Sequence, residues 1–387
     1  MEYKEYELGE LLYYEQPTPY IVESTDYNDA YGTPVLTAGK SFILGYTDEK
    51  EGIFNQLPVI IFDDFTTASQ YVNFKFKVKS SAMKILTPAK HLVLPKYIYY
   101  RMQIIDFDHS THKRYWIQQY SKIRVGIPPL AEQERIVSRI EELFSQLDAG
   151  METLKKTKAQ LAVYRQAVLK EAFEGRLTAS GLEKIARLGD YIETPRYGTS
   201  KKCSYDDGRD RTAVYRIPNI EHKNGRISHD DIKYAQFTES ELDGIRLQQG
   251  DILIIRSNGS VSLVGRAAMV CDADITGTFA GYLMRLRISE PETLLPKFLL
   301  LFLQSHQARI YIENKAKSTS GVHNINSTEI SDLHLPLYDL DTQYAIIEAI
   351  ESRLSVCDSI EQTVDTALQQ AEAMRQSILK DAFEGRL

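Results

Sequence analysis

Side chains that could support catalysis occur in this chain, but their spacing does not match a catalytic site. Ala38–Ser41 read AGKS, like the end of a phosphate-binding loop, yet Pro34 stands where that loop requires its first glycine. Acidic-x-Lys triplets begin at Glu2, Asp48 and Asp231, and none is placed beside a second carboxylate on a predicted strand. The eight histidines lack metal-ligand spacing, and the Asn/Asp-Pro-Pro-aromatic tetrapeptide of amino-methyltransferases is missing. We therefore expect no catalytic residue and no metal site.

The composition limits the classes of protein to consider. The 387 residues allow two or three domains, and 43% hydrophobic with 26% charged residues is typical of a soluble globular protein. No apolar run approaches the roughly 18 residues of a membrane helix, and the first ten residues do not form a signal peptide. Cys203, Cys271 and Cys357 are too widely spaced for a zinc motif or a disulfide framework. A cytoplasmic location without membrane association is expected.

Charge is distributed unevenly, although the net charge is −7. Residues 1–64 carry 3 Lys against 13 Asp and Glu, whereas residues 65–127 carry 11 Lys and Arg against 2 Asp. In the basic stretch, strict alternation over Asn73–Lys79 predicts a strand with Lys75, Lys77 and Lys79 facing outward. Alternate residues of a strand are about 6.8 Å apart, close to the phosphate spacing of DNA. An edge strand protected by lysines is the alternative.

A second cluster combines charge with aromatic rings. Lys113-Arg114-Tyr115-Trp116 stands just before a predicted strand and suits contact with a nucleic-acid backbone and its bases. The alternative is that Trp116 packs inward.

The second half of the sequence has basic and polar loops of the same kind. The candidate residues in these loops are Arg196, Tyr197, Lys201, Lys202, Arg256, Ser257, Asn258, Arg266, His323, Asn324 and Asn326. With a shift of two residues, His323-Asn324 aligns with Tyr115-Trp116 of the first half. Arginine with guanine and asparagine with adenine are the favoured bidentate pairs in DNA recognition. Each of these residues could instead form a turn or contact a phosphate.

One helical segment occurs twice, as Gln133–Leu177 and Gln343–Leu387, and both copies end in AFEGRL. Apolar residues recur every seven positions, as expected for a coiled-coil seam. They are Ile140, Leu147, Leu154, Leu161 and Val168 in the first copy and Ile350, Cys357, Val364, Ala371 and Ile378 in the second. Gly175 and Gly385 are expected helix ends. Two ordinary amphipathic helices, each packed on its own domain, are the alternative.

The connection between the halves predicts that the two helices pair antiparallel. About six residues join Leu177 to the second module near Glu183, and no long return segment for a parallel pair exists. About 42 residues per helix would make a spacer of about 60 Å. Gly150 is a weak point in the first helix, at about 1 kcal/mol against alanine.

The segments before the helices share landmarks that indicate a mixed α/β fold. These landmarks are a buried strand (Pro58–Phe62 and Asp251–Arg256), a helix opened by proline (Pro95 and Pro296) and a final alternating strand (Ile123–Ile127 and Leu333–Leu337). We predict the α/β (α+β) class, with two modules separated by a long antiparallel two-helix coiled coil in a pseudo-twofold internal repeat. The expected segments are 1–127, 128–177, 178–335 and 336–387.

Several short motifs together resemble the specificity subunit of type I restriction-modification systems. They are the helix entry Pro128–Val137 (PPLAEQERIV), the openings Leu8-Gly9 and Leu188-Gly189, the loop residues Ser320-Gly321 and Asn324–Asn326, and the two AFEGRL endings. The resemblance extends from end to end of the chain. The second helix entry departs from the pattern, since Leu337–Gln343 reads LYDLDTQ.

The resemblance implies two target-recognition domains that each read half of a split double-stranded DNA sequence, with the helices as a ruler. It implies two methyltransferase subunits and restriction translocase-nuclease subunits as partners, with S-adenosylmethionine bound by the methyltransferase and no cofactor in this chain. Lys40 joins the basic and polar residues named above as a candidate DNA contact. A self-sufficient modification enzyme with an unrecognised active site, or a scaffold whose modules bind peptides, are the alternatives.

Overall fold

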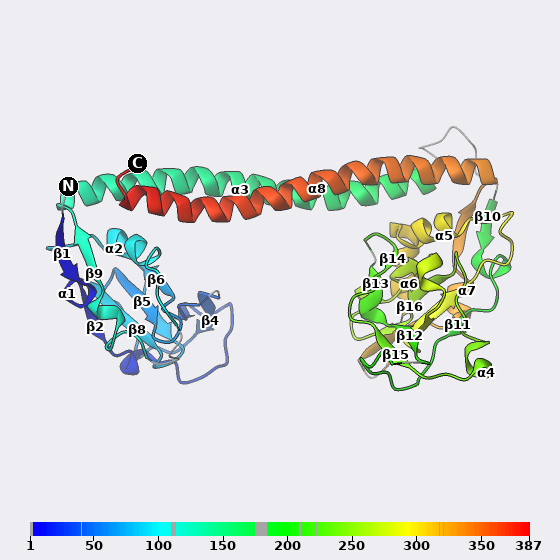
Figure 1. Cartoon of the computed structure of the whole chain (residues 1–387), viewed down its shortest axis with the longest axis horizontal. Helices are drawn as coiled ribbons and strands as arrows, with labels where there is room; N and C mark the ends of the chain where they lie inside the picture. Colours follow the sequence, from blue (N-terminus) through cyan, green and yellow to red (C-terminus); the bar gives the residue numbers. More distant parts are fainter. Residues whose placement is uncertain are drawn as a thin grey trace. The chain divides into compact units, whose positions relative to one another are not determined.

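The computed structural model describes residues 3–39, 41–109, 114–174, 184–208, 210–221, 223–316, 318–319 and 321–387. Lys40 and Lys113 lie outside these ranges, so their predicted role stays a prediction. The chain forms two compact units: unit 1 comprises Met1–Lys155 with Asp365–Leu387, and unit 2 comprises Lys156–Val364. Each unit therefore holds one α/β module and a segment of each of two long helices (Figure 1).

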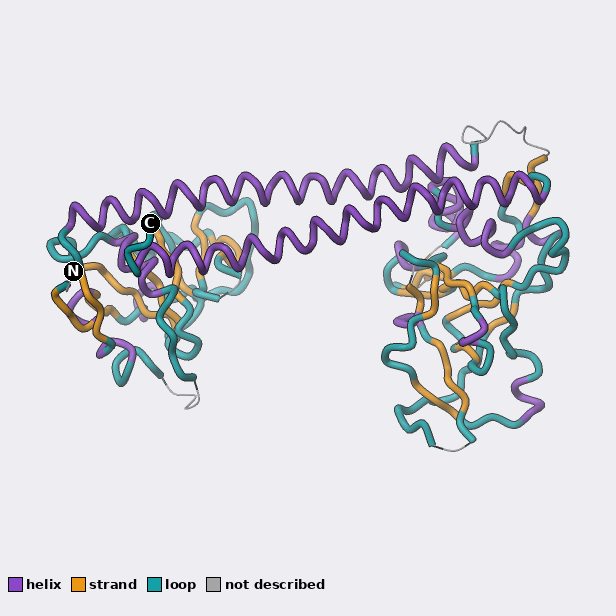
Figure 2. Tube along the Cα trace, turned by 45° about the horizontal axis from the view of Figure 1, so that its top comes forward, coloured by secondary structure: helices purple, strands orange, loops and turns teal. Residues whose placement is uncertain are grey.

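The two long helices are α3 (Leu130–Phe173) and α8 (Leu340–Phe383), each of 44 residues. In unit 1 the beginning of α3 lies beside the end of α8, and in unit 2 the end of α3 lies beside the beginning of α8 (Figures 1 and 2). The pair is therefore antiparallel, as the short connection predicted. Gly385 follows α8 with φ +75°, a left-handed conformation that favours glycine, whereas Gly175 lies outside the described residues.

The seven-residue repeat lies in the interface between the helices. In α8, the exposed fractions rise only from 0% to 9% along the row Ile350, Cys357, Val364, Ala371 and Ile378. In α3, Ile140 and Val168 are buried, and the row residues between them are half-buried. Val163, which lies off this row, is 71% exposed. The predicted seam is confirmed, because burial follows the seven-residue period.

Charged residues beside the seam repeat with the internal symmetry. In unit 2, Arg165 Nη2 lies 2.6 Å from Asp358 Oδ1. In unit 1, Arg375 and Asp148, which occupy the corresponding positions of the other sequence copies, also form an ion pair. Exposed pairs of this kind stabilise by only about 0–1 kcal/mol, so the buried seam contributes more. The pseudo-twofold relation therefore extends from the sequence to the contacts.

A buried glutamine joins each module to the helix that follows it. In unit 1 the Gln133 side chain, 0% exposed, accepts from the Leu94 N–H at 2.8 Å and donates to the carbonyls of Leu92 and Pro128 at 3.0 and 2.9 Å. In unit 2 the corresponding Gln343, also 0% exposed, accepts from Leu295 N–H at 2.9 Å. Its amide donates to the carbonyls of Thr293 and Tyr338 at 2.7 and 2.8 Å. Each glutamine satisfies three backbone groups at the junction, through one buried and two partly buried hydrogen bonds.

The two modules have the same strand topology. Unit 1 has an antiparallel sheet of order β2-β8-β5-β6, a mixed sheet β4-β3-β7 and the antiparallel pair β1-β9; unit 2 repeats these as β11-β20-β16-β18, β15-β12-β19 and β10-β23. The strands of unit 1 are β1 (Lys4–Glu7), β2 (Leu12–Glu15), β3 (Thr33–Leu36), β4 (Ile43–Thr47), β5 (Val59–Asp63), β6 (Ser69–Val72), β7 (Lys77–Val78), β8 (Met83–Pro88) and β9 (Arg124–Ile127). Those repeated in unit 2 are β10 (Lys184–Arg187), β11 (Arg196–Tyr197), β12 (Thr212–Tyr215), β15 (Lys233–Ala235), β16 (Ile252–Ile255), β18 (Ala267–Met269), β19 (Thr278–Phe279), β20 (Leu283–Leu286) and β23 (His334–Leu337). The predicted mixed α/β class with an internal repeat is confirmed.

Unit 2 has further short elements. They are the hairpin β13 (Ile220–Glu221) and β14 (Arg226–Ile227), the sheet β17 (Ser257–Asn258), β22 (Val322–Asn324) and β21 (Ser318–Thr319), and the helices α4 (Glu239–Leu242), α6 (His306–Lys315) and α7 (Ser327–Ser331). Ser257 and Asn258, expected in a loop, form the short strand β17, because they pair with Asn324 and His323.

Aromatic packing places each module against the long helices. The prolines predicted to open helices start α2 (Pro95–Met102) and α5 (Pro296–Leu303), while α1 is Leu8–Leu11. In unit 1 the rings of Tyr97 on α2 and Phe383 at the end of α8 lie 5.2 Å apart. In unit 2 Phe298 on α5 and Phe173 at the end of α3 repeat this contact at 5.2 Å. The phenylalanine of each AFEGRL ending, Phe173 or Phe383, thus packs on a module.

Candidate nucleic-acid interface

The two modules share a backbone position at which their side chains differ. Asp64 follows β5 and donates its N–H to the Ala82 carbonyl at 3.1 Å, while Arg256 follows β16 and donates to Tyr282 at 2.9 Å. Their carbonyls each accept a bond of 2.9 Å, from Tyr115 N–H in unit 1 and from Ile325 N–H in unit 2. Asp64 and Arg256 are therefore structurally equivalent.

The same contacts correct one alignment. Since Tyr115 corresponds to Ile325, the preceding residues Arg114 and Asn324 correspond to each other. The predicted match of His323-Asn324 with Tyr115-Trp116 is wrong. The correspondence is fixed by backbone hydrogen bonds to Asp64 and Arg256, which the sequence alone does not reveal.

In unit 1 the residue at the shared position, Asp64, forms a buried ion pair. Lys84 Nζ lies 3.4 Å from Asp64 Oδ2, and their side chains are 1% and 2% exposed. Trp116 donates its backbone N–H to Asp64 Oδ1 at 2.8 Å, and its ring packs on Phe62. Tyr115 and Trp116 are 1% and 2% exposed, so the inward alternative for Trp116 is confirmed. Tyr115 is enclosed among aromatic rings as well, and its predicted orientation toward DNA is wrong.

The three lysines of the predicted basic strand do not share one face. Lys75 and Lys79 are exposed, but Lys77 is 4% exposed. Its Nζ lies 2.6 Å from Glu49 Oε2 and donates to the Glu51 carbonyl at 2.8 Å. The prediction for Lys77 is wrong, because β7 has only two residues and its lysine turns toward an acidic loop.

Arg114 is the other exposed candidate of unit 1. Its guanidinium carbon lies 5.9 Å from the centre of the Phe65 ring, and that ring is 46% exposed. Arg114 therefore has a free surface beside an exposed aromatic side chain, whereas its neighbour Tyr115 has none.

In unit 2 the shared position opens into a cavity of about 580 Å³. Its lining residues are Thr199, Ser200, Lys201, Cys203, Arg216, Ile217, Pro218, Lys233, Arg256, Ala280, Gly281 and Tyr282. Tyr282 on the wall is 63% exposed, and Tyr205, whose ring lies 4.6 Å from Lys233 Nζ, is 64% exposed. Cationic side chains beside exposed aromatic rings are the groups that bind phosphates and stack on bases.

The cavity retains positive charge after its ion pairs are counted. Lys201 Nζ lies 2.7 Å from Glu241 Oε2, and Arg216 Nη2 lies 2.9 Å from Asp231 Oδ2. Hydrogen bonds from Tyr205 and Arg216 hold the pKa of Asp231 below its usual value, so this carboxylate stays charged. In the described part of the chain, no carboxylate lies within ion-pair distance of Lys233 or Arg256. These two cations give the cavity its excess charge.

Other predicted residues of unit 2 fall into three groups. Tyr197 contacts Arg256, and Ser257, Asn258, His323 and Asn324 lie together in the adjoining small sheet. Arg196 and Lys202 are exposed. Asn326 caps α7 by accepting from Glu329 N–H at 2.9 Å, which is the turn-forming alternative.

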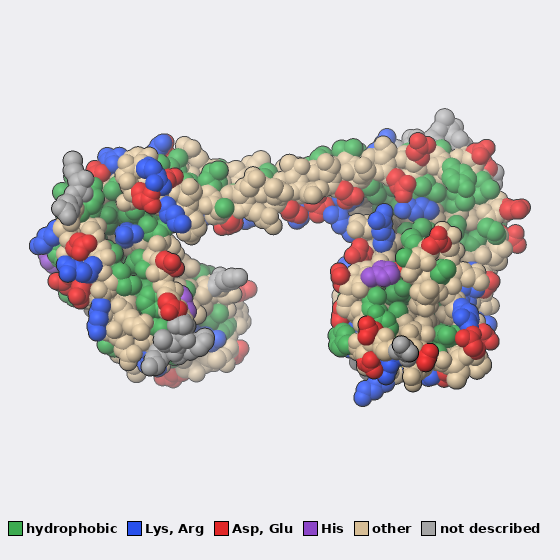
Figure 3. Space-filling view, viewed as in Figure 1, with side chains coloured by type: hydrophobic (Ala, Val, Ile, Leu, Met, Phe, Trp, Pro, Cys, Tyr) green, Lys and Arg blue, Asp and Glu red, His purple; other side chains and the backbone are tan. Residues whose placement is uncertain are grey.

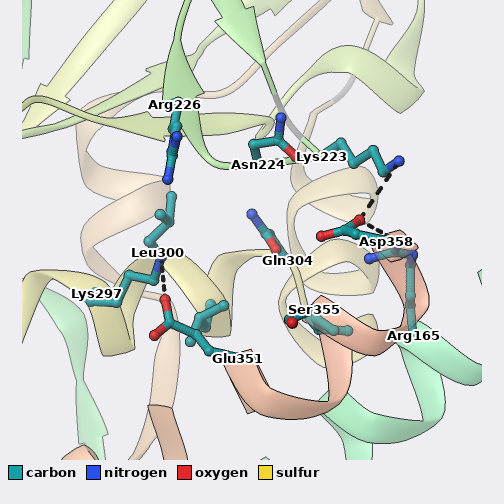
Figure 4. Close-up of a pocket in the computed structure, with 12 residues that line it drawn as sticks. Arg165, Lys223, Asn224, Arg226, Lys297, Leu300, Gln304, Glu351, Ser355 and Asp358 are labelled. Atoms are coloured by element: carbon teal, nitrogen blue, oxygen red, sulfur yellow. Dashed lines mark hydrogen bonds and ion pairs between the residues drawn. The ribbon is translucent and has the colours of Figure 1, made fainter. Parts of the chain in front are cut away.

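Arg266 is not part of the cavity that contains Arg256. Its side chain lines a separate cavity of about 470 Å³ beside the long helices, together with Arg165 and Lys223. Figure 3 shows Lys and Arg side chains gathered where the module of unit 2 meets these helices. In Figure 4, Lys223 and Arg165 both reach Asp358, and Lys297 reaches Glu351 at 2.8 Å. Most cations here have carboxylate partners, so this region carries less unpaired positive charge than the cavity that contains Arg256.

Sequence reasoning missed Arg216, Lys233 and Tyr282 as members of the cavity. They come from separate segments, and Lys233 was noted only as part of the acidic-x-Lys triplet at Asp231. In the sequence, the pair Gly281-Tyr282 was the best indication of a binding surface, because a glycine lets a ligand approach the backbone closely beside an aromatic ring.

No helix in the described ranges is long and apolar enough to cross a membrane. Among the same residues, no group of three or more His, Cys, Asp and Glu side chains is arranged to hold a metal ion.

The fold and the cavity define a protein with two topologically equivalent α/β modules of different surface chemistry, joined by an antiparallel helix pair. Residues 1–162 match the family model of the type I restriction modification DNA specificity domain. The EcoR124I/EcoR124II specificity subunit of Escherichia coli is 47% identical over 175 residues, 42% of this chain and 43% of that protein. The EcoKI specificity subunit of E. coli K12 is 30% identical over 277 residues, 69% of this chain and 58% of that protein. The chain therefore resembles type I restriction-modification specificity subunits, as its motifs predicted, and residues 1–162 match their DNA specificity domain.

The matched regions span 43% and 58% of the length of these two curated relatives. Solved structures agree in fold. A chain from a study of complex assembly and conformational transition of the type I R-M system has a TM-score of 0.73 at 15% identity, covering 100% of this chain and 98% of that one. The HsdS subunit of Thermoanaerobacter tengcongensis has a TM-score of 0.52 at 15% identity, covering 100% and 97%.

Proposed function

We propose that this chain is a non-catalytic, sequence-specific DNA-binding subunit that recognises a bipartite target in double-stranded DNA. The observation that carries the proposal is the cation-lined cavity of unit 2, with exposed Tyr282 and Tyr205 beside Lys233 and Arg256. The relatives, named as specificity subunits of restriction enzymes, support it. Two modules with one topology and different side chains suit the reading of two different half-sites.

The proposal includes the partners that carry out the chemistry. Two methyltransferase subunits would bind S-adenosylmethionine and modify the DNA, and translocase-nuclease subunits would cleave it. This chain would direct them to the target and bind no cofactor itself. A cytoplasmic location follows from these partners.

Selection from a randomised duplex library at controlled salt tests the proposal. The full chain should enrich a split sequence of two fixed parts separated by a gap of constant length. Binding without sequence preference would contradict it. Incubation of the purified chain with DNA and labelled S-adenosylmethionine separates the enzyme alternative, because methyl transfer without a partner subunit would support that alternative.

We further propose that the paired helices set the gap between the half-sites. Deleting four residues, about one helical turn, from each of α3 near Leu154 and α8 near Val364 shortens each helix by about 6 Å. At about 3.4 Å per base pair, the preferred gap should shorten by about two base pairs. Mapping of methylated adenines in a host carrying the variant measures the gap. An unchanged gap would refute the ruler role.

A further inference from the structure

We propose that Arg256 selects a guanine in the half-site bound by unit 2, and that Tyr197 positions it for this contact. The inference rests on the proposed DNA-binding function and adds a base and a residue to it. It follows from how the guanidinium is held, which groups of it remain available, and what the other module places at the same position.

The backbone of Arg256 is fixed on both sides. Its N–H donates to Tyr282 at 2.9 Å, and its carbonyl accepts from Ile325 N–H at 2.9 Å. The preceding strand β16 is buried along its length and pairs with β18 and β20. The Arg256 side chain therefore starts from a rigid sheet rather than from a loose loop.

The guanidinium itself lies over an aromatic ring. Its central carbon lies 4.3 Å from the centre of the Tyr197 ring, and one Nη1 group donates to the Gly281 carbonyl at 3.1 Å. The Tyr197 hydroxyl accepts from Ser327 N–H at 3.0 Å, which fixes the ring in turn. An arginine whose rotamer is already restricted loses less entropy when it binds a ligand.

The donors that face away from these contacts have no partner. Nε of Arg256 is buried and makes no hydrogen bond with any described residue. Because Nε has no solvent-exposed surface, a ligand reaches the guanidinium through its outer Nη groups, and Nη2 makes no hydrogen bond with any described residue. Guanine presents two adjacent acceptors, O6 and N7, in the major groove, and arginine is the side chain that pairs with both.

Unit 1 shows that this position is used differently in the two modules. The equivalent Asp64 is paired with Lys84, and both side chains are almost fully enclosed. An acidic residue in a closed ion pair presents no donor to a base edge. The same backbone frame therefore offers a guanine-specific donor in unit 2 and none at this place in unit 1.

Lys233 provides the contrast within the cavity. It is a flexible point charge with no carboxylate within ion-pair distance among the described residues, and its Nζ lies over the exposed Tyr205 ring. A single ammonium suits a phosphate, which carries no sequence information. Replacing Lys233 and replacing Arg256 should therefore have different consequences.

The test compares charge-preserving and charge-removing variants in the randomised duplex selection, with the full chain. Arg256→Lys keeps the positive charge but loses the planar pair of donors. It should lower the preference for guanine at one position of one half-site by about 5- to 150-fold and leave the other positions and the salt dependence unchanged. Lys233→Ala is the matched control and should weaken binding to all sequences alike. Tyr197→Ala should relax the same guanine position as Arg256→Lys.

A modified base tests the inference without any change in the protein. Replacing each guanine of the selected duplex in turn by 7-deazaguanine removes N7, and one position should lose affinity for the wild-type chain but not further for Arg256→Lys. An unchanged motif for a folded Arg256→Lys variant, a uniform loss across sequences, or no guanine sensitive to N7 removal would each overturn it. If the wild-type chain enriches no sequence, the proposed function itself fails.

Discussion

The buried glutamine at the start of each long helix leads to a quantitative prediction. Replacing Gln133 by leucine keeps a similar volume but removes the partner of the Leu94 N–H and of the Leu92 and Pro128 carbonyls. Each buried backbone group left without a partner costs about 1–2 kcal/mol, so Gln133→Leu should lower the free energy of unfolding by about 3–6 kcal/mol. The loss is large because water cannot replace a side chain that is 0% exposed.

Tryptophan fluorescence measures this loss directly. The chain has one tryptophan, Trp116, which is 2% exposed in the core of unit 1. Urea unfolding followed at this residue reports on the module that Gln133 joins to α3. With a slope of about 2 kcal/mol per molar urea, the midpoint should fall by about 1.5–3 M.

A second glutamine on the same helix provides the control. Gln146 is exposed on α3, and Gln146→Leu should change the free energy of unfolding by no more than about 0.5 kcal/mol. A loss below about 1 kcal/mol for Gln133→Leu would refute the reasoning, because it would mean that the three backbone groups find other partners. Equal losses for both variants would point instead to a general effect of leucine on the helix surface.

Two other substitutions test how the modules are built. Lys77→Met should lower the free energy of unfolding by about 1–3 kcal/mol in a urea titration, because the Glu49 side chain, 19% exposed, would lose its ion-pair partner; an unchanged midpoint would show that this pair is dispensable. Gly198→Ala should cost about 1–3 kcal/mol and weaken DNA binding, because a Cβ there would lie 2.2 Å from the Phe279 carbonyl oxygen, next to the cavity-lining residues Thr199 and Ala280. Gly244→Ala, with nothing within 4 Å of the new Cβ, is its control, and equal thermal shifts for both glycine variants would contradict the packing argument.

Elements with a strong local pattern were predictable from the sequence. One such pattern is the seven-residue row of α3 and α8, and another is the proline that opens α2 and α5. Each pattern occurs twice and favours a helix through residues close together in the sequence. The buried runs that became β5 and β16 were also visible, because a run of branched apolar residues has few alternatives to a core strand.

Side-chain direction was less predictable where an element is short. Alternation suggested that Lys77 faces outward, but its two-residue strand lets it turn to Glu49, which precedes it by 28 positions. Tyr115 was expected to contact DNA and instead packs inward, since its backbone is bound to Asp64. In both cases the partner comes from a distant segment that no local pattern identifies.

The sequence by itself determined that the chain is a duplicated α/β protein with two long helices, because a duplication and a seven-residue period are visible in the order of the residues. It also placed Arg256 and Tyr197 among the candidate binding residues. Only the tertiary structure decided that these two side chains are in contact, that Arg216 and Lys233 share one cavity with Arg256, and that the equivalent position of unit 1 is a buried Lys84–Asp64 ion pair. The physical reason is that a cavity and its charge depend on contacts between segments far apart in the chain.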